Sequence, residues 1–186
     1  PGGGFGEHGH ANMEIISYVL SGELAHKDSE GNESVIRPGD VQKMTAGTGI
    51  RHSEFNHSKQ SLVQFLQIWV VPDQVNVAPG YVQKHFAGLL EPAEAPTLIF
   101  SPYGEGESLR IYQDVSVLAG KLVNDSHWQY AGNQNRIGWL QVVEGSAQVN
   151  GETVSAGDGV AFVAGEAVEV SKTNDLHILY FDLPAK

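Results

Sequence analysis

A chain of 186 residues, 41% hydrophobic and 18% charged, is long enough to bury a core and is not typical of a disordered protein. Its formal net charge of −11 argues against direct binding to nucleic acid or to anionic lipids, because their phosphate groups would repel it. The absence of cysteine excludes disulfides, thiolate metal ligands and cysteine nucleophiles, so any metal must be held by nitrogen or oxygen.

The apolar stretches and the first residues of the chain indicate the cellular location that we expect. The longest apolar stretch, around residues 65–71, is too short to span a bilayer, and no signal peptide opens the chain. We therefore expect a cytoplasmic protein without a membrane partner, and we expect it to be a monomer. The chain begins at Pro1 with dense motifs within ten residues, so we expect an upstream segment to be missing.

Short runs rich in Val, Ile, Leu and Tyr predict strands, and glycine and proline between them predict turns. In chain order these runs are residues 15–20, 61–71, 108–112, 137–143 and 177–183. Clusters such as Pro38-Gly39-Asp40 supply the backbone geometry of tight connections. No window of a dozen residues has convincing helical periodicity, so the sequence predicts an all-β fold.

The chain also repeats itself. Residues 37–47 read RPGDVQKMTAG and residues 155–165 read SAGDGVAFVAG, with Gly-Asp and Ala-Gly at matching places. A second match pairs residues 18–22 with residues 141–145. We predict two similar β units joined through the Pro- and Glu-rich stretch at residues 90–96, which gives domains at residues 1–92 and 93–186.

Two pairs of side chains carry the candidate chemistry, His8 with His10 and His52 with Glu54. Residues i and i+2 of an extended chain point to the same face, so each pair can reach one point. Neighbouring strands carrying the two pairs would present three imidazoles and a carboxylate to one ion. The spacing therefore predicts a site for one divalent metal ion.

Other polar and aromatic residues receive no role in the site. Five histidines lack a partner at metal-ligand spacing and are expected to be surface or hydrogen-bonded core residues, namely His26, His57, His85, His127 and His177. Arg51 and Lys43 are expected to be solvated or to form surface ion pairs. Phe5, Trp69 and Trp139 are expected to pack in the core.

The motifs resemble those of a known family. The run from Gly2 through His8, His10 and Glu14 to Gly22 resembles the first cupin motif, and residues 39–56 resemble the second. Within the cupins, residues 4–10, 13–15 and 46–54 are similar to the pirins and the pirin-like quercetin 2,3-dioxygenases. The resemblance implies a bicupin, in which two antiparallel β-barrels of the double-stranded β-helix type pack together and only the N-terminal barrel holds a metal.

In this family the metal is usually iron, and the residues that match its ligands are His8, His10, His52 and Glu54. The repeat places Ala131, Asn133, Val170 and Lys172 at the equivalent positions of the second unit, so no site is expected there. The general cupin motif would instead make Glu14 the carboxylate ligand. We favour Glu54 as the ligand, with Glu14 orienting a histidine.

The resemblance implies a dioxygenase that uses O2 to open the ring of flavonols such as quercetin, with Glu54 accepting the proton of the substrate hydroxyl. Fe(2+) is the expected metal, and the donor set also suits Zn, Mn, Co, Ni or Cu. The alternative is an iron-binding regulatory protein that acts through protein partners without turnover. A third reading is a metal that only pins two strands together.

Overall fold

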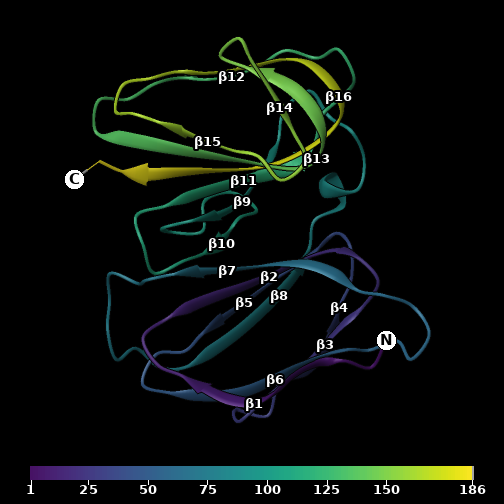
Figure 1. Ribbon diagram of the computed structural model, residues 1–186. Coiled ribbons are helices and arrows are strands. Elements are labelled where there is room, and N and C mark those ends of the chain that lie inside the picture. Colours follow the sequence, from purple (N-terminus) through teal and green to yellow (C-terminus); the bar gives the residue numbers. More distant parts are fainter. Residues whose placement is uncertain (186) are drawn as a thin grey trace. The chain divides into compact units, whose positions relative to one another are not determined.

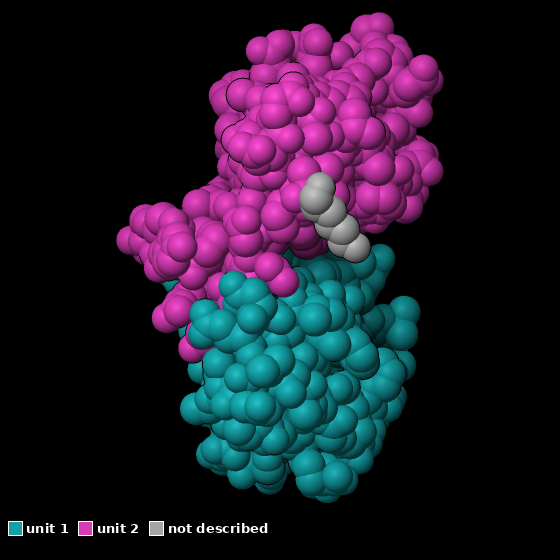
Figure 2. Space-filling view, turned by 90° about the vertical axis from the view of Figure 1, so that its left-hand side faces the viewer, with its two compact units in different colours: residues 1–86 teal, residues 87–186 magenta. Residues whose placement is uncertain are grey.

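The computed structural model describes residues 1–185 and divides into two compact units, residues 1–86 and residues 87–186 (Figures 1 and 2). The prediction of an all-β fold is confirmed. Within residues 1–185 the helical segment is a single 3-10 turn, η1 at Ala87–Leu89, and every other regular element is a strand. No helix in this described part is long and apolar enough to cross a membrane.

Unit 1 consists of two four-stranded antiparallel sheets (Figure 1). The first has the order β1-β6-β3-β4, with bounds Gly4–His10, Ile50–Asn56, Leu24–Asp28 and Glu33–Ile36. The second has the order β7-β2-β5-β8, with bounds Gln64–Val70, Glu14–Ser21, Asp40–Thr45 and Gly80–His85. The two sheets pack face to face, as contacts between them show: Ile15 of β2 and Met44 of β5 share an apolar cluster with Ile50 of β6.

The burial pattern of β6 explains why polar side chains enter this interior. Ile50, His52, Glu54 and Asn56 are buried, whereas Arg51 and Phe55 between them are exposed. Successive residues of a strand face opposite sides of a sheet, so the four buried residues, which are two positions apart, all lie on the inner face. The strand therefore delivers an imidazole and a carboxylate into the space between the two sheets.

Unit 2 is built on one large sheet of order β10-β9-β11-β16-β13-β14 (Figure 1). The bounds are Leu109–Arg110, Thr97–Ser101, Ser116–Lys121, Val168–Pro184, Arg136–Val149 and Glu152–Ser155. Two further strands extend it: β12 at Trp128–Tyr130 pairs with β16, and β15 at Gly159–Phe162 pairs with β13. Its core is a continuous apolar cluster that includes Trp128, Leu140, Val170 and Tyr180.

Candidate metal centre

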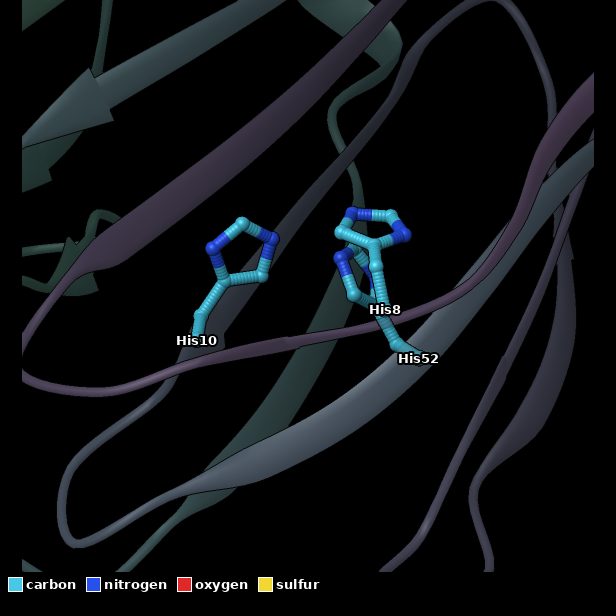
Figure 3. Close-up of side chains that lie close together, drawn as sticks. All are labelled: His8, His10 and His52. Atoms are coloured by element: carbon cyan, nitrogen blue, oxygen red, sulfur yellow. The ribbon is translucent and has the colours of Figure 1, made fainter.

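Antiparallel pairing of β1 with β6 brings the two predicted pairs of residues together. In this register His8 lies opposite His52 and His10 lies opposite Ile50. The rings of His8, His10 and His52 converge on one point (Figure 3). Their centroids are 4.5 Å apart for His8 and His52, 4.8 Å for His8 and His10, and 5.1 Å for His10 and His52.

One ligand atom from each of these three rings lies within 4.8 Å of the other two. The Nδ1 of His8 is 2.8 Å from the carbonyl oxygen of Gly6. A carbonyl can only accept, so the proton of the neutral ring is on Nδ1 and the lone pair is on Nε2. The backbone thereby fixes His8 in a tautomer that is suited to binding a metal through Nε2.

The other two rings have nitrogens that the protein does not use. Among residues 1–185, neither His10 Nε2 nor either ring nitrogen of His52 has a hydrogen-bond partner, although all are buried. A buried polar atom without a partner costs about 1–3 kcal/mol, and such atoms are rare in folded proteins. A divalent metal ion would satisfy His10 Nε2 and one of the two ring nitrogens of His52, so the residues present fit the group that the motif implies.

The environment lowers the pKa of two of these imidazoles, those of His10 and His52. Burial, followed by the neighbouring rings of His8, His26 and His10, lowers the pKa of His52 to about 3. Burial and the adjacent His8 also lower the pKa of His10. A metal binds the neutral imidazole, so the cluster does not have to release protons from these two rings before binding at neutral pH.

Glu54 lies beside this cluster rather than inside it. Its side chain is buried, and its carboxylate accepts hydrogen bonds from Ser17 Oγ at 2.7 Å and Gln67 Nε2 at 2.5 Å. It forms a second group of possible ligands with His52 and His26, whose ligand atoms also lie within 4.8 Å of one another. The structure thus brings three predicted ligands together and places the fourth next to His52.

The alternative carboxylate, Glu14, is committed to another contact. Its Oε2 accepts a hydrogen bond from Lys43 Nζ at 2.6 Å, and both side chains are buried. Within residues 1–185, Glu14 belongs to neither group of possible metal ligands. The expectation that Lys43 is a solvated or surface charge is wrong, because β5 lies inside the sheet and directs this ammonium towards a buried carboxylate.

His26 is a residue that the sequence argument left out of the site. It is buried on β3, opposite Glu54 in the register with β6, and its ring centroid is 5.4 Å from that of His52. Its Nε2 contacts Asp28 Oδ2 at 3.1 Å. Burial alone would raise the pKa of Asp28, but hydrogen bonds from His26 and Asn32 lower it. The missed signal was available, since His26 and Asp28 are a third pair at i and i+2.

Three aromatic residues that were expected to lie in the core are exposed. Phe5 is 51%, Trp69 52% and Trp139 41% accessible to solvent. Two of them border the cluster: the ring centroid of Phe5 is 6.4 Å from that of His8, and the centroid of Trp69 is 5.0 Å from that of His10. Hydrophobicity alone did not reveal which face of its strand each ring occupies.

Unit 2 repeats the strand pairing with different side chains. Trp128 of β12 lies opposite Val170 of β16, as His8 lies opposite His52 in unit 1. With Val170 taken as the equivalent of His52, as the repeat predicts, this pairing places Trp128 at the position of His8, whereas the repeat offset alone placed Ala131 there. Both Trp128 and Val170 belong to the apolar core of unit 2.

Comparisons with known proteins cover nearly the whole chain. Residues 2–70 match the family model described as Pirin, and residues 98–183 match the model described as Quercetinase C-terminal cupin domain. The second match agrees with the expectation of a cupin unit in this half of the chain.

Among the relatives, the chain is 37% identical over 183 residues to the quercetin 2,3-dioxygenase of Escherichia coli, an alignment that covers 98% of this chain and 78% of that protein. Two solved structures resemble it strongly. The crystal structure of YhhW from E. coli gives a TM-score of 0.93, with 37% identity, over 100% of this chain and 77% of that one. The bacterial pirin YhhW in complex with nickel(II) gives 0.91, also with 37% identity, over 98% and 77%.

Proposed function

This chain belongs to the pirin family of bicupins, and from that premise we propose that it is a metal-dependent dioxygenase that opens the ring of flavonols such as quercetin. The observation that supports the proposal best is the convergence of three imidazoles, two of which, His10 and His52, have buried nitrogens without a hydrogen-bond partner within residues 1–185. The relative that is 37% identical over nearly the whole chain bears the name of this activity.

The proposed ligands are His8, His10, His52 and Glu54. A divalent metal is consistent with this donor set and with the nickel(II) bound by the similar pirin from E. coli. We propose Fe(2+) as the native metal, with Zn, Mn, Co, Ni or Cu as possible substitutes. Four protein donors leave room on a six-coordinate ion for exogenous ligands such as substrate and O2. A carboxylate oxygen of Glu54 already lies within 4.8 Å of a ring nitrogen of His52. To complete the proposed ligand set, the Glu54 side chain would have to turn towards the ion that the three histidines hold.

When bound, the metal supplies Lewis acidity that favours the deprotonated hydroxyl of a flavonol. The protein has to take up the proton that is released. A carboxylate oxygen of Glu54 is the proposed acceptor, and the hydrogen bonds from Ser17 and Gln67 keep that carboxylate oriented until the proton arrives. Packing of the two sheets around Glu54 limits competing water, because this side chain is only 1% exposed.

The test is anaerobic reconstitution of the metal-free chain with Fe(2+), followed by addition of quercetin and then O2. Loss of the flavonol absorbance together with release of carbon monoxide is the expected result. The matched control replaces an exposed histidine of unit 2, His127→Ala, and should retain full activity. Absence of turnover with every divalent metal tried would refute the dioxygenase, and the regulatory alternative would then be the better account of the same site.

A further inference from the structure

Trp69 lies at the solvent-facing border of the proposed metal centre. It is the penultimate residue of β7, 52% exposed, and its ring meets the ring of His10 edge to face, at 5.0 Å between centroids and 82° between planes. Tryptophan has the largest apolar side chain, and an exposed indole ring beside a cluster of possible metal ligands offers a flat face to a molecule that binds there.

Hydrogen bonds hold this indole in place. Trp69 Nε1 donates to Gln67 Oε1 at 3.2 Å, and Gln67 Nε2 donates to Glu54 Oε2 at 2.5 Å. The acceptor and donor ends of the Gln67 amide are thus both used, which fixes the orientation of the amide. The exposed ring is therefore connected through one side chain to the carboxylate that we propose as ligand and base.

The charged groups near the cluster favour an uncharged contact with substrate. Lys43 is paired with Glu14, and Arg51 with Glu7 at 2.9 Å. Both cations are already engaged by carboxylates, and the net charge of −11 disfavours binding of an anion from solution. A planar, largely neutral aromatic molecule would be recognised instead through ring contact and burial of apolar area.

We propose that Trp69 is a specificity-determining residue that forms an aromatic wall against which a planar polyphenol lies while its hydroxyl group reaches the histidine cluster. This inference rests on the proposed function. In this proposal Trp69 selects aromatic substrates, whereas the histidines and Glu54 bind the metal and accept the proton. Gln67 is the positioning residue that ties the wall to Glu54.

The first measurement tests the placement of Trp69 without any turnover. Titration of the metal-free chain with Ni(2+) or Co(2+) should quench the fluorescence of a tryptophan that touches a metal-binding imidazole. Quenching is expected in the wild type and in Trp139→Phe, and it should largely disappear in Trp69→Phe. Trp139 is a matched control because it is similarly exposed, at 41%, and lies in unit 2. Equal quenching in both variants would overturn the placement.

The second measurement tests selectivity, with quercetin as the probe. In the iron-loaded chain, Trp69→Ala should raise KM, and the anaerobic Kd for quercetin, about tenfold while kcat changes little, since an aromatic contact with its buried area is of this size. Trp69→Phe keeps a ring and should lose less, and Trp139→Ala should match the wild type.

The outcomes separate the two proposals. If the wild type converts quercetin and Trp69→Ala has unchanged KM and Kd, the inference about Trp69 is wrong and the proposed function stands. If the iron-loaded wild type neither binds nor converts quercetin, both are refuted. Circular dichroism of Trp69→Ala checks its fold, and Trp69→Phe gives the same test with a smaller perturbation.

Discussion

The properties of single side chains decide what the cluster can bind. His8 is held by the Gly6 carbonyl so that Nε2 carries the lone pair, and the nitrogens of His10 and His52 are buried without partners among residues 1–185. These nitrogens are a cost to the metal-free protein, and binding of a metal removes the part that comes from His10 Nε2 and from one nitrogen of His52. The same atoms that destabilise the empty site therefore supply affinity for the ion.

The first prediction concerns His52, the most buried of the three. His52→Ala should reduce affinity for Fe(2+) or Ni(2+) by at least about a hundredfold, because even the loss of a residue that only orients a ligand costs 10–100-fold. His177→Ala, which removes a buried histidine of unit 2, should leave metal content unchanged. Metal analysis of both purified variants after dialysis decides the matter. Full occupancy in both would show that the proposed ligand set is wrong.

The second prediction separates the two candidate carboxylates. Glu14→Gln removes the carboxylate charge that faces the buried ammonium of Lys43, so the free energy of unfolding should fall by about 3–5 kcal/mol while metal content persists. Glu54→Gln should do the opposite and impair metal binding more than stability. Denaturant unfolding and metal analysis of each variant provide the two readouts.

A double variant serves as the control for Glu14. Replacing both members of the pair, Glu14→Gln with Lys43→Met, should recover part of the lost stability, because the buried ammonium is then removed together with the carboxylate. Loss of metal in Glu14→Gln, with metal retained in Glu54→Gln, would transfer the ligand role to Glu14.

At the scale of strands, alternation explains what could be predicted from the sequence and what could not. The i, i+2 spacing places His8 and His10 on one face of β1, and His52 and Glu54 on one face of β6, whatever the rest of the fold is. Register between strands is a different matter, since it depends on partners distant in sequence. The spacing of His26 and Asp28 could therefore mark a third polar pair, but it could not show that β3 lies beside β6 and brings His26 next to His52.

Gly22, part of the predicted motif, lies in the turn between β2 and β3 and closely approaches the connection between β6 and β7. It has φ of +76°, and a Cβ there would lie 2.3 Å from the carbonyl oxygen of Leu62. Gly31 has φ of +90° but no atom within 4 Å of its Cβ position. A side chain at Gly31 would meet backbone strain alone, whereas a side chain at Gly22 would meet backbone strain and steric overlap. Comparing the two glycines therefore separates these two costs.

The third prediction follows from this pair. Gly31→Ala should cost about 1–2 kcal/mol, the penalty of a left-handed conformation. Gly22→Ala should cost about 2 kcal/mol more, because the connection between β6 and β7, which contains Leu62, has to shift away from the new methyl group. Equilibrium denaturation of the two variants measures the difference. Equal costs would mean that the chain at Leu62 moves freely away from the new methyl group.

Across the whole chain, the two units have similar strand pairing but different interiors, one lined with polar ligands and one apolar. Equivalent strand pairs carry His8 opposite His52 in unit 1 and Trp128 opposite Val170 in unit 2. The first pair needs a ligand to satisfy its nitrogens, whereas the second is satisfied by apolar packing alone. The repeat was visible in the sequence through its matching turn residues. The correspondence of Trp128 with His8 was not, because the number of residues between the matching turns and the two strands differs between the units.

Each unit nevertheless holds a buried histidine that resists protonation, and this has a consequence for acid stability. Burial lowers the pKa of His177 from 6.5 to about 4, although Glu144 opposes the shift. Between these pH values the unfolded chain binds a proton at this residue and the folded chain does not. The free energy of unfolding therefore falls as pH drops from about 6.5 towards 4, and this contribution is complete below 4.

The fourth prediction is that His177→Gln weakens this acid sensitivity. The wild type should lose up to about 3 kcal/mol through His177 over that interval, since each pKa unit corresponds to about 1.4 kcal/mol. The variant should show a correspondingly smaller difference in unfolding free energy between pH 7 and pH 4.5. Denaturant unfolding in the presence of a chelator keeps metal binding by unit 1 out of the comparison. The exposed histidine variant His127→Gln should follow the wild type. An identical pH dependence in His177→Gln would show that the buried imidazole of unit 2 does not set the acid limit.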